Sequence, residues 1–282
     1  QCLVGSEMCI RDRFFGGLYC VELDPETGLP AEEGDQGHLT ARRANYQKDN
    51  LEAPEIIYNP DLKQYYLFVS YDPLMTTYNV RVGRSDKAEG PFVDFSGVEL
   101  KDTTNNFPIL TAPYRFHNHP GWAGTAHCSV FTSDEGQYFM AHQGRLSPHN
   151  QMMDLHLRQV FFTPDGWPVV SPERYTGSVS RKFSAEDMAG EWEVIRIQEP
   201  AYERRLQAGQ ILWGEGQLKE EEWNVSHLLS LEKNGHLGEN KGNWEFLEAK
   251  QLLSLTLEGE IINNLIISVS YTHLRAHETL SD

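Results

Sequence analysis

Residues 50–85 decide the fold and begin Asn-Leu-Glu-Ala-Pro-Glu-Ile-Ile-Tyr-Asn-Pro-Asp. Three short runs of aromatic and β-branched residues follow one another there, with turn residues between them: Ile56–Tyr58, Tyr65–Tyr71 and Tyr78–Arg84. Such runs predict successive antiparallel strands, which is the topology of one blade of a β-propeller. Glu52 stands at the entrance of the first strand, where its carboxylate can face the central axis of such a fold.

A second hairpin repeats the first one further along the chain. The segments that start at Ala53 and Gln64 align with those that start at Ala126 and Gln137, at an offset of about 73 residues. Propeller repeats are usually about 40–50 residues long. We therefore interpret Phe95–Gly121 as an insertion between blades. A β-sandwich would give similar short strands and stays open as an alternative.

The composition changes near Pro172–Ser180, which predicts a second domain. Ser184 and Asp187 have the spacing of a helix capping box. Asn234-Gly235 is typical of a tight hairpin turn, and alternating apolar residues follow it. The fold class is therefore all-β, with a partial propeller followed by a small antiparallel barrel or sandwich. No catalytic constellation is visible in the second domain.

Both ends of the chain differ from the middle. Residues 1–13 lack a strand or helix period, residues 269–282 break the preceding alternation, and both resemble translated sequencing-adaptor read-through. Without these ends, we expect part of a propeller at 14–175 and an incomplete C-terminal β domain at 176–268.

Cysteine usage and charge exclude several classes of protein. Cys20 and Cys128 remain once the ends are set aside, without the spacing of a disulfide framework or a zinc site, and buried free thiols are expected. The net charge of −17 repels nucleic acids and anionic membranes. The chain has no apolar run near the ~20 residues of a membrane span. Aromatic residues make up 11%, which suits carbohydrate contact as well as a β-rich core.

Glu52 and His127 are the residues with the best position for chemistry. Glycoside cleavage usually uses two carboxylic groups, one of which protonates the leaving oxygen. Glu52 suits that role, although a surface glutamate is the commoner interpretation and Glu55 competes with it. His127 occupies the matching strand entrance of the next blade, where it can bind a metal or adjust an acid. A hydrogen-bonded core histidine is the plainer alternative.

Other candidates are weaker. His117 and His119 lack a third ligand at zinc spacing and are interpreted as loop residues near the cleft. Four aromatic residues offer ring faces for sugar stacking, and packing is the commoner use of each: Phe14, Phe15, Tyr71 and Trp122.

Taken together, these motifs resemble family 43 glycoside hydrolases, and among them endo-α-1,5-L-arabinanases with an appended C-terminal β domain. The resemblance covers Phe14 to about Tyr175. It implies a five-bladed propeller and a hydrolysis that inverts the configuration at the anomeric carbon. The matching segments are Phe15–Gly28, Leu51–Pro54, Tyr66–Tyr71, Tyr78–Ser85, Gly124–His127 and Asp165–Tyr175.

The resemblance implies roles for particular residues. Glu52 corresponds to the general acid, and His127 to a histidine linked through water to a calcium ion. Phe15, Gly16 and Tyr71 are expected to border the sugar. The implied partner is arabinan, a side chain of pectin, and the implied protein is secreted. We expect a monomer, with neither nucleic acid nor membrane as a partner.

The chain also departs from the family pattern. The family's catalytic base, an aspartate of the first blade, has no counterpart here, nor has the aspartate that adjusts the acid. Asp12 lies in the suspect end, in a context that does not match. About two and a half blades are therefore expected. The alternatives are an exo-acting arabinofuranosidase or xylosidase of the same fold and a non-catalytic carbohydrate-binding propeller.

We predict that this chain alone is inactive, because general acid catalysis without a base leaves little more than binding. Purified residues 14–268 are expected to release no reducing ends from linear arabinan. Measurable cleavage by that segment would contradict the prediction.

Overall fold

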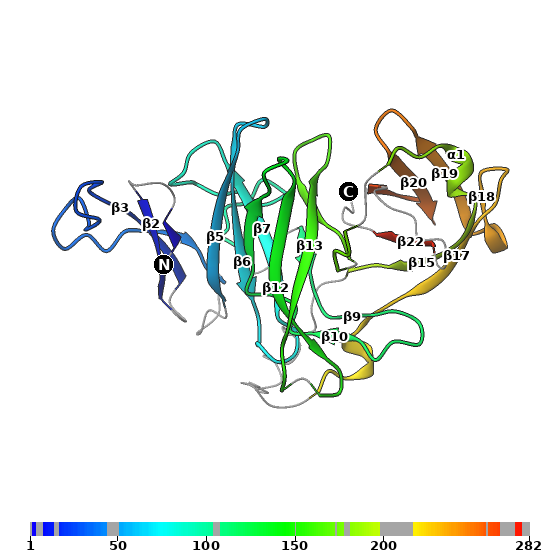
Figure 1. Ribbon diagram of the computed structural model, residues 1–282, viewed down its shortest axis with the longest axis horizontal. Helices are drawn as coiled ribbons and strands as arrows, with labels where there is room; N and C mark the ends of the chain where they lie inside the picture. The colour runs from blue at the N-terminus through cyan, green and yellow to red at the C-terminus, as the bar shows by residue number, and fades with distance from the viewer. Residues whose placement is uncertain are drawn as a thin grey trace.

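The computed structural model is built almost wholly of β-strands (Figure 1). Within the described residues, no helix has the length and apolar character that crossing a membrane requires. The described residues are 2–3, 8–13, 17–43, 51–103, 108–149, 151–172, 174–177, 181–197, 217–257, 259–265 and 274–277.

The first sheet has four antiparallel strands in sequence order. Strand β3 lies within the family-matching segment Phe15–Gly28, and its partner β2 lies within residues 1–13, where we expected no regular structure. Strand pairing uses backbone groups, so an open sheet edge can take up a segment that has no clear pattern. The adaptor interpretation of that segment remains a prediction. The strands are β1 (Cys2–Leu3), β2 (Met8–Arg13), β3 (Gly17–Glu22) and β4 (His38–Ala41).

The second sheet contains the stretch that decides the fold, and its three expected strands are confirmed. Its fourth strand, β8, comes from Phe95–Gly121, so the interpretation of that stretch as an insertion is wrong in part. A three-residue strand shows no detectable period, which is why the pattern missed it. The strands are β5 (Leu51–Asn59), β6 (Gln64–Tyr71), β7 (Asn79–Ser85) and β8 (Ile109–Thr111).

The repeated hairpin forms the third sheet, as the alignment predicted. Gly136 adopts a φ of 77° in its turn, a conformation that glycine reaches without a steric cost. The short strand β10 continues the sheet by pairing with β12, and β9 pairs with β10. The strands are β9 (Tyr114–Arg115), β10 (Trp122–Ala123), β11 (Ser129–Thr132), β12 (Tyr138–Leu146), β13 (Asp154–Phe162) and β14 (Pro168–Val170).

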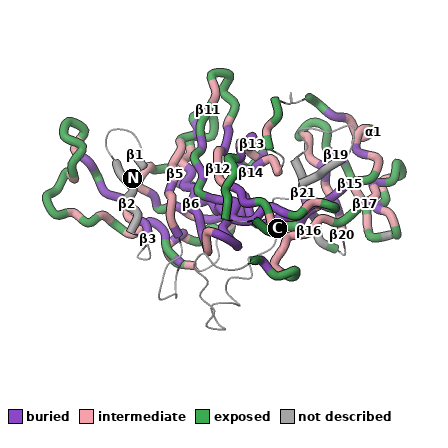
Figure 2. The backbone as a smooth tube through the Cα atoms, turned by 60° about the horizontal axis from the view of Figure 1, so that its bottom comes forward, coloured by how far each residue is buried: buried purple, intermediate pink, exposed green. Residues whose placement is uncertain are grey.

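Strand β6 is buried on both faces and joins the three sheets into one body (Figure 2). Successive side chains of a strand point to opposite faces. Tyr66 and Phe68 therefore pack toward the third sheet, in a core with Val80, Met140 and Trp167. The alternate residues of β6, which include Leu67 and Val69, pack toward the first sheet.

The C-terminal sheet has its own core around Trp192, which is 1% exposed. The capping box is confirmed, because the carboxylate of Asp187 accepts hydrogen bonds from the backbone N–H and the hydroxyl of Ser184. Gly235 adopts a φ of 84° in the expected hairpin turn. Strand β16 belongs to the third sheet, whereas the other strands from β15 onward form the C-terminal sheet. The elements of this part of the chain are α1 (Ala185–Met188), β15 (Gly190–Ile195), η1 (Glu220–Glu222), β16 (Asn224–Val225), β17 (His227–Leu231), β18 (His236–Leu237), η2 (Gly238–Asn240), β19 (Gly242–Leu247), β20 (Leu252–Leu257), β21 (Glu260–Leu265) and β22 (Leu274–His277).

The two parts of the chain are joined by strands and by hydrogen bonds. Strand β16 pairs in parallel with β9, which attaches the C-terminal part to the third sheet. The Asn224 side chain donates to the carbonyl of Pro113 at 2.7 Å. The buried carboxylate of Glu193 accepts from the backbone N–H of His117 and from Ser226 Oγ. These contacts attach the C-terminal part of the chain to β9 and to the loop before β10.

A buried network around Arg158 links β12 to β13. Its Nε donates to His142 Nε2 at 2.7 Å, while His142 Nδ1 donates to the carbonyl of Gln143 at 2.6 Å. The neighbouring His156 is fully buried, and its Nε2 has no hydrogen-bond partner within the described part of the chain. Burial, helped by the charge of Arg158, lowers the pKa of His156 to about 3 and holds the pKa of His142 well below its usual range. Both rings are therefore neutral at pH 7.

We predict that acid destabilises the chain through His156. The unfolded histidine binds a proton near pH 6.5 and the folded one only near pH 3, so stability is complete above pH 6.5 and falls as the pH drops toward 3. The loss from this residue is about 2 kcal/mol at pH 5. Urea unfolding at pH 7 and pH 5 measures it.

In His156→Gln the difference in unfolding free energy between pH 7 and pH 5 should shrink by about that amount, whatever the absolute stability of the variant. His236, which is exposed, provides the control His236→Gln, with the wild-type pH dependence. Equal pH slopes for all three proteins would exclude this role of His156.

Candidate active site

A β-bulge at the start of β5 directs Glu52. The pairing with β6 shifts register between Glu52 and Glu55, and Ala53 adopts a φ of 51°. Non-glycine residues in this left-handed region are uncommon, and they concentrate where backbone strain serves a site. The Glu52 side chain remains 24% exposed at the head of this strand.

His127 has a similar backbone conformation just before β11, with a φ of 56°. Its backbone N–H donates to Ser70 Oγ at 2.9 Å, and Ser70 is the cross-strand partner of Glu52. The preceding Ala126 is fully buried. The ring of His127 is thus held above the core while its side chain stays 62% exposed.

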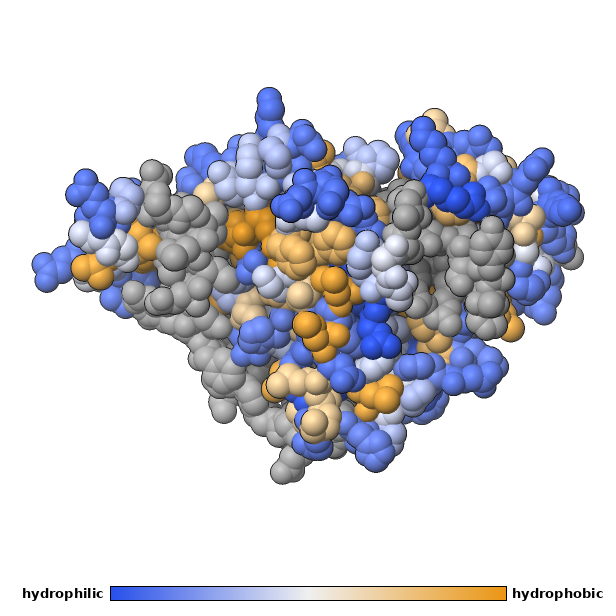
Figure 3. Space-filling model, in the orientation of Figure 1, coloured by the Kyte–Doolittle hydropathy of each residue, from blue (hydrophilic) through white to orange (hydrophobic). Residues whose placement is uncertain are grey.

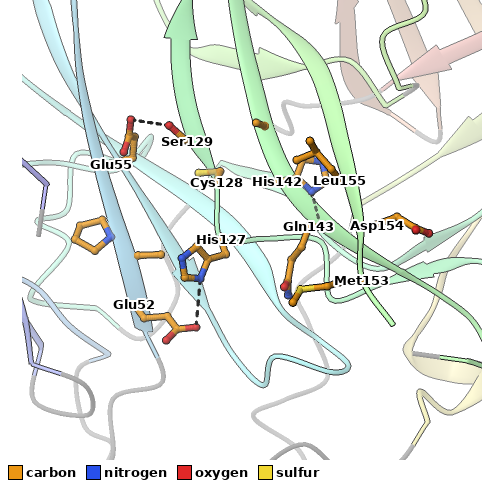
Figure 4. A pocket seen from close by; sticks show the side chains of 13 residues that line it. Glu52, Glu55, His127, Cys128, Ser129, His142, Gln143, Met153, Asp154 and Leu155 are labelled. Atoms are coloured by element: carbon orange, nitrogen blue, oxygen red, sulfur yellow. Dashed lines mark hydrogen bonds and ion pairs between the residues drawn. The ribbon is translucent and has the colours of Figure 1, made fainter. Parts of the chain in front are cut away.

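The structure brings Glu52 and His127 together, as the repeat predicted. Glu52 Oε1 lies 4.0 Å from His127 Nδ1, and both side chains line one cavity (Figure 4).

The cavity has a volume of about 740 Å³. Glu55 lies further along β5, where its Oε1 accepts a hydrogen bond from Ser129 Oγ at 3.2 Å. Met153 and Leu155 add exposed apolar surface at the start of β13, and Figure 3 shows hydrophobic side chains gathered in this part of the molecule. The cavity is lined by Glu52, Ala53, Pro54, Glu55, His127, Cys128, Ser129, Ala141, His142, Gln143, Met153, Asp154 and Leu155.

Tyr78, which the sequence analysis treated only as the start of a strand, contacts both site residues. Its hydroxyl donates to Glu52 Oε1 and lies 3.5 Å from His127 Nδ1. Burial above all, and then the charge and hydrogen bond of Glu52, raise the pKa of Tyr78 far above that of a free phenol. The phenol therefore stays protonated. The sequence signal that could have identified Tyr78 as a site residue was its position just before β7, close to the two repeated strand starts.

Tyr71 does not border the cavity, so the predicted sugar contact is not supported. Its ring is fully buried, with the guanidinium groups of Arg43 and Arg81 at 5.4 and 4.9 Å from its centroid. A ring enclosed in this way has no face free for a sugar. The predicted contacts of Phe15 and Gly16 fall outside the described residues.

The remaining candidates contribute to packing and to loop structure. Trp122 is buried, with its ring edge-on to His156 at 4.4 Å between centroids. His119 Nδ1 accepts the backbone N–H of Gly121, and the backbone of His117 is bound by Glu193. Both histidines therefore serve the loop before β10.

The described residues near His127 do not form a calcium cage. Calcium takes six to eight oxygen ligands, whereas His127 offers a nitrogen. No group of three or more His, Cys, Asp or Glu residues in the described ranges has metal-binding geometry. A calcium ion reached through water remains a prediction.

Comparison with known proteins identifies the family of the chain. A sequence model described as glycosyl hydrolases family 43 matches residues 4–168, which is more than half of the chain. A model of a C-terminal lipocalin-like domain matches residues 172–280. The first match contains Glu52, Tyr78 and His127.

Curated relatives are named for action on arabinan. Extracellular endo-alpha-(1->5)-L-arabinanase 2 of Bacillus subtilis (strain 168) is 26% identical and aligns with 93% of this chain and 56% of its own length. The extracellular endo-alpha-(1->5)-L-arabinanase of Thermotoga petrophila is 29% identical, with coverage of 68% and 44%. An extracellular exo-alpha-(1->5)-L-arabinofuranosidase of Cellvibrio japonicus is 25% identical, with coverage of 60% and 49%. The chain spans about half the length of these relatives.

Solved structures share the fold. A family 43 glycoside hydrolase from Bacillus licheniformis superposes with a TM-score of 0.76 at 22% identity, over 97% of this chain and 62% of its own. Endo-1,5-alpha-L-arabinanase from Thermotoga petrophila RKU-1 gives 0.75 at 25% identity, over 95% and 59%. The four-stranded sheets are therefore blades of a five-bladed propeller followed by a β domain. The chain belongs to glycosyl hydrolases family 43.

Proposed function

We propose that the protein containing this chain hydrolyses α-1,5-linked L-arabinan, with Glu52 as the general acid. The observation that carries the proposal is the convergence of Glu52 and His127 on one cavity, 4.0 Å apart, from the heads of two adjacent blades. The substrate class is supported by the names of the relatives. A neutral polysaccharide is also compatible with a net charge of −17, which would repel a polyanion.

In the proposed reaction, the Glu52 carboxylic acid gives its proton to the glycosidic oxygen as the bond to the anomeric carbon breaks. Water attacks that carbon from the opposite face and passes a proton to a second carboxylate. In inverting enzymes the two carboxyl groups stand about 6.5–9.5 Å apart, which leaves room for the water. By family resemblance the second carboxylate comes from the first blade.

Two further properties are proposed from the same resemblance. The relatives are named extracellular, so we propose that this protein is secreted. We expect endo action, which depends on a cleft open at both ends. Products distinguish it from exo action, because an endo enzyme first releases oligosaccharides of mixed length and an exo enzyme releases one short product.

Glu52→Gln in the complete protein tests the central claim. General acid catalysis is worth about 10²–10⁴-fold, so kcat on linear arabinan should fall by about that factor while the affinity for arabino-oligosaccharides is kept. Reducing-end release and calorimetric titration measure the two quantities. Glu55→Gln is the matched control on the same strand and cavity, and is expected to retain most of the turnover.

Undiminished turnover in Glu52→Gln would refute the hydrolase assignment of Glu52. A wild-type protein that binds arabino-oligosaccharides without cleaving any arabinan would favour the non-catalytic binding propeller instead.

Calcium binding near His127 is proposed from the resemblance and has its own test. Calorimetric titration with calcium chloride is expected to show one site in the complete protein and weaker binding in His127→Ala, because a water held by the ring is lost. Identical titration of both proteins would rule out the link to His127.

A further inference from the structure

The phenol of Tyr78 lies in the site, and the proposed reaction assigns no function to it. Its hydroxyl donates to Glu52 Oε1 and lies within 3.5 Å of His127 Nδ1. It therefore reaches both of the residues that converge on the cavity, although Tyr78 itself is only 1% exposed.

Packing gives the Tyr78 ring a fixed position. It belongs to the core between the second and third sheets, together with Phe68 and Val80. Its backbone N–H donates to the carbonyl of Pro73 at 3.1 Å, which secures the turn that leads into β7. Because both the backbone and the ring of Tyr78 are held in place, its hydroxyl group has a fixed position.

Ser70 ties the same three residues together. It is the cross-strand partner of Glu52, it accepts the backbone N–H of His127, and its side chain hydrogen-bonds to the phenol of Tyr78. A phenol that shares one hydrogen bond with Ser70 and gives its own proton to Glu52 has a defined direction of donation. The hydroxyl proton of Tyr78 therefore points at Oε1.

The protonation of Tyr78 supports this direction. Burial and the neighbouring Glu52 carboxylate raise the pKa of Tyr78, so the phenol keeps its proton at neutral pH and remains a donor. An oxygen that already accepts a hydrogen bond from a permanent donor is the poorer place for a second proton. The proton of a neutral Glu52 then belongs on Oε2.

We propose that Tyr78 is a positioning residue that holds the Glu52 carboxyl group by Oε1 and places the transferable proton on Oε2. The inference rests on the proposed function and deepens it. In the acid step the Oε2–H bond breaks and the proton joins the glycosidic oxygen. The electron pair of the carbon–oxygen bond goes to that oxygen, and water adds to the carbon and gives its proton to the second carboxylate. Without the phenol, the carboxyl group rotates and its proton divides between two oxygens.

The test compares two leaving groups in the complete protein carrying Tyr78→Phe. Linear arabinan has a leaving oxygen that needs a proton, whereas a 4-nitrophenyl arabino-oligosaccharide releases a phenolate that needs little help. We expect kcat on arabinan to fall about 10-fold or more, a part of the general acid contribution. On the aryl substrate it should fall less than about 3-fold, with KM on both substrates nearly unchanged.

Tyr66→Phe is the matched control. Tyr66 is fully buried in the same core, and its hydroxyl donates to the carbonyl of Gly166 at 2.5 Å, away from Glu52. Both variants lose one buried hydroxyl, so both should lose some stability on thermal unfolding. Only Tyr78→Phe should discriminate between the leaving groups.

An equal fall on both substrates, or no fall on either, would overturn the proposal. Glu52→Gln, measured beside it, separates the two claims. If Glu52→Gln loses arabinan turnover and Tyr78→Phe keeps it, the positioning role fails and the proposed function stands. If Glu52→Gln keeps turnover, the proposed function fails. If Tyr78→Phe does not fold, Ser70→Ala is measured in its place. Its kcat on arabinan should fall more than its kcat on the aryl substrate, by a smaller factor than expected for Tyr78→Phe. Equal kcat changes on the two substrates would count against the positioning role of Tyr78.

Discussion

The packing of the second sheet against the third is the contact on which the candidate site depends. Glu52 and His127 are 75 positions apart in the chain, and nothing local brings them together. Apolar side chains of β6 and β7 interdigitate with those of β11, β12 and β13, with rings such as Tyr66 and Phe68 fully buried. Burial of a large apolar side chain stabilises by about 1.5–3 kcal/mol. The heads of β5 and β11 are held side by side as a consequence.

The site lies on a rigid packed core, and the backbone is strained where β5 and β11 begin. The core beneath it is continuous, whereas the two residues that turn the chain toward the cavity, Ala53 and His127, both adopt positive φ values. Such conformations cost about 1–3 kcal/mol and persist where the surrounding structure determines them. The C-terminal part of the chain contributes to that surrounding structure through β16, which pairs with β9 as the last strand of the third sheet. This pairing links the C-terminal part of the chain to β12 by way of β9 and β10.

Much of the fold was predictable from local pattern. Alternation and turn residues located β5, β6 and β7, the repeat located β11 and β12, and the capping box located α1. The short strand β8 was missed, because three residues hold too little pattern to distinguish a strand from a loop. Tyr71 was misplaced for another reason. A strand buried on both faces has no polar side, so its aromatic residues give no sign of which ones reach a cavity.

The sequence by itself determined the all-β class, the family and the two residues at matching strand entrances, because these depend on residue type and spacing along the chain. Tertiary structure alone decided that Tyr78 bonds Glu52 and that Tyr71 is enclosed by Arg43 and Arg81. Those contacts depend on the direction of side chains that meet across neighbouring strands and sheets. A one-residue step along a strand reverses that direction, and only the packed core selects which face of each strand is turned toward the site.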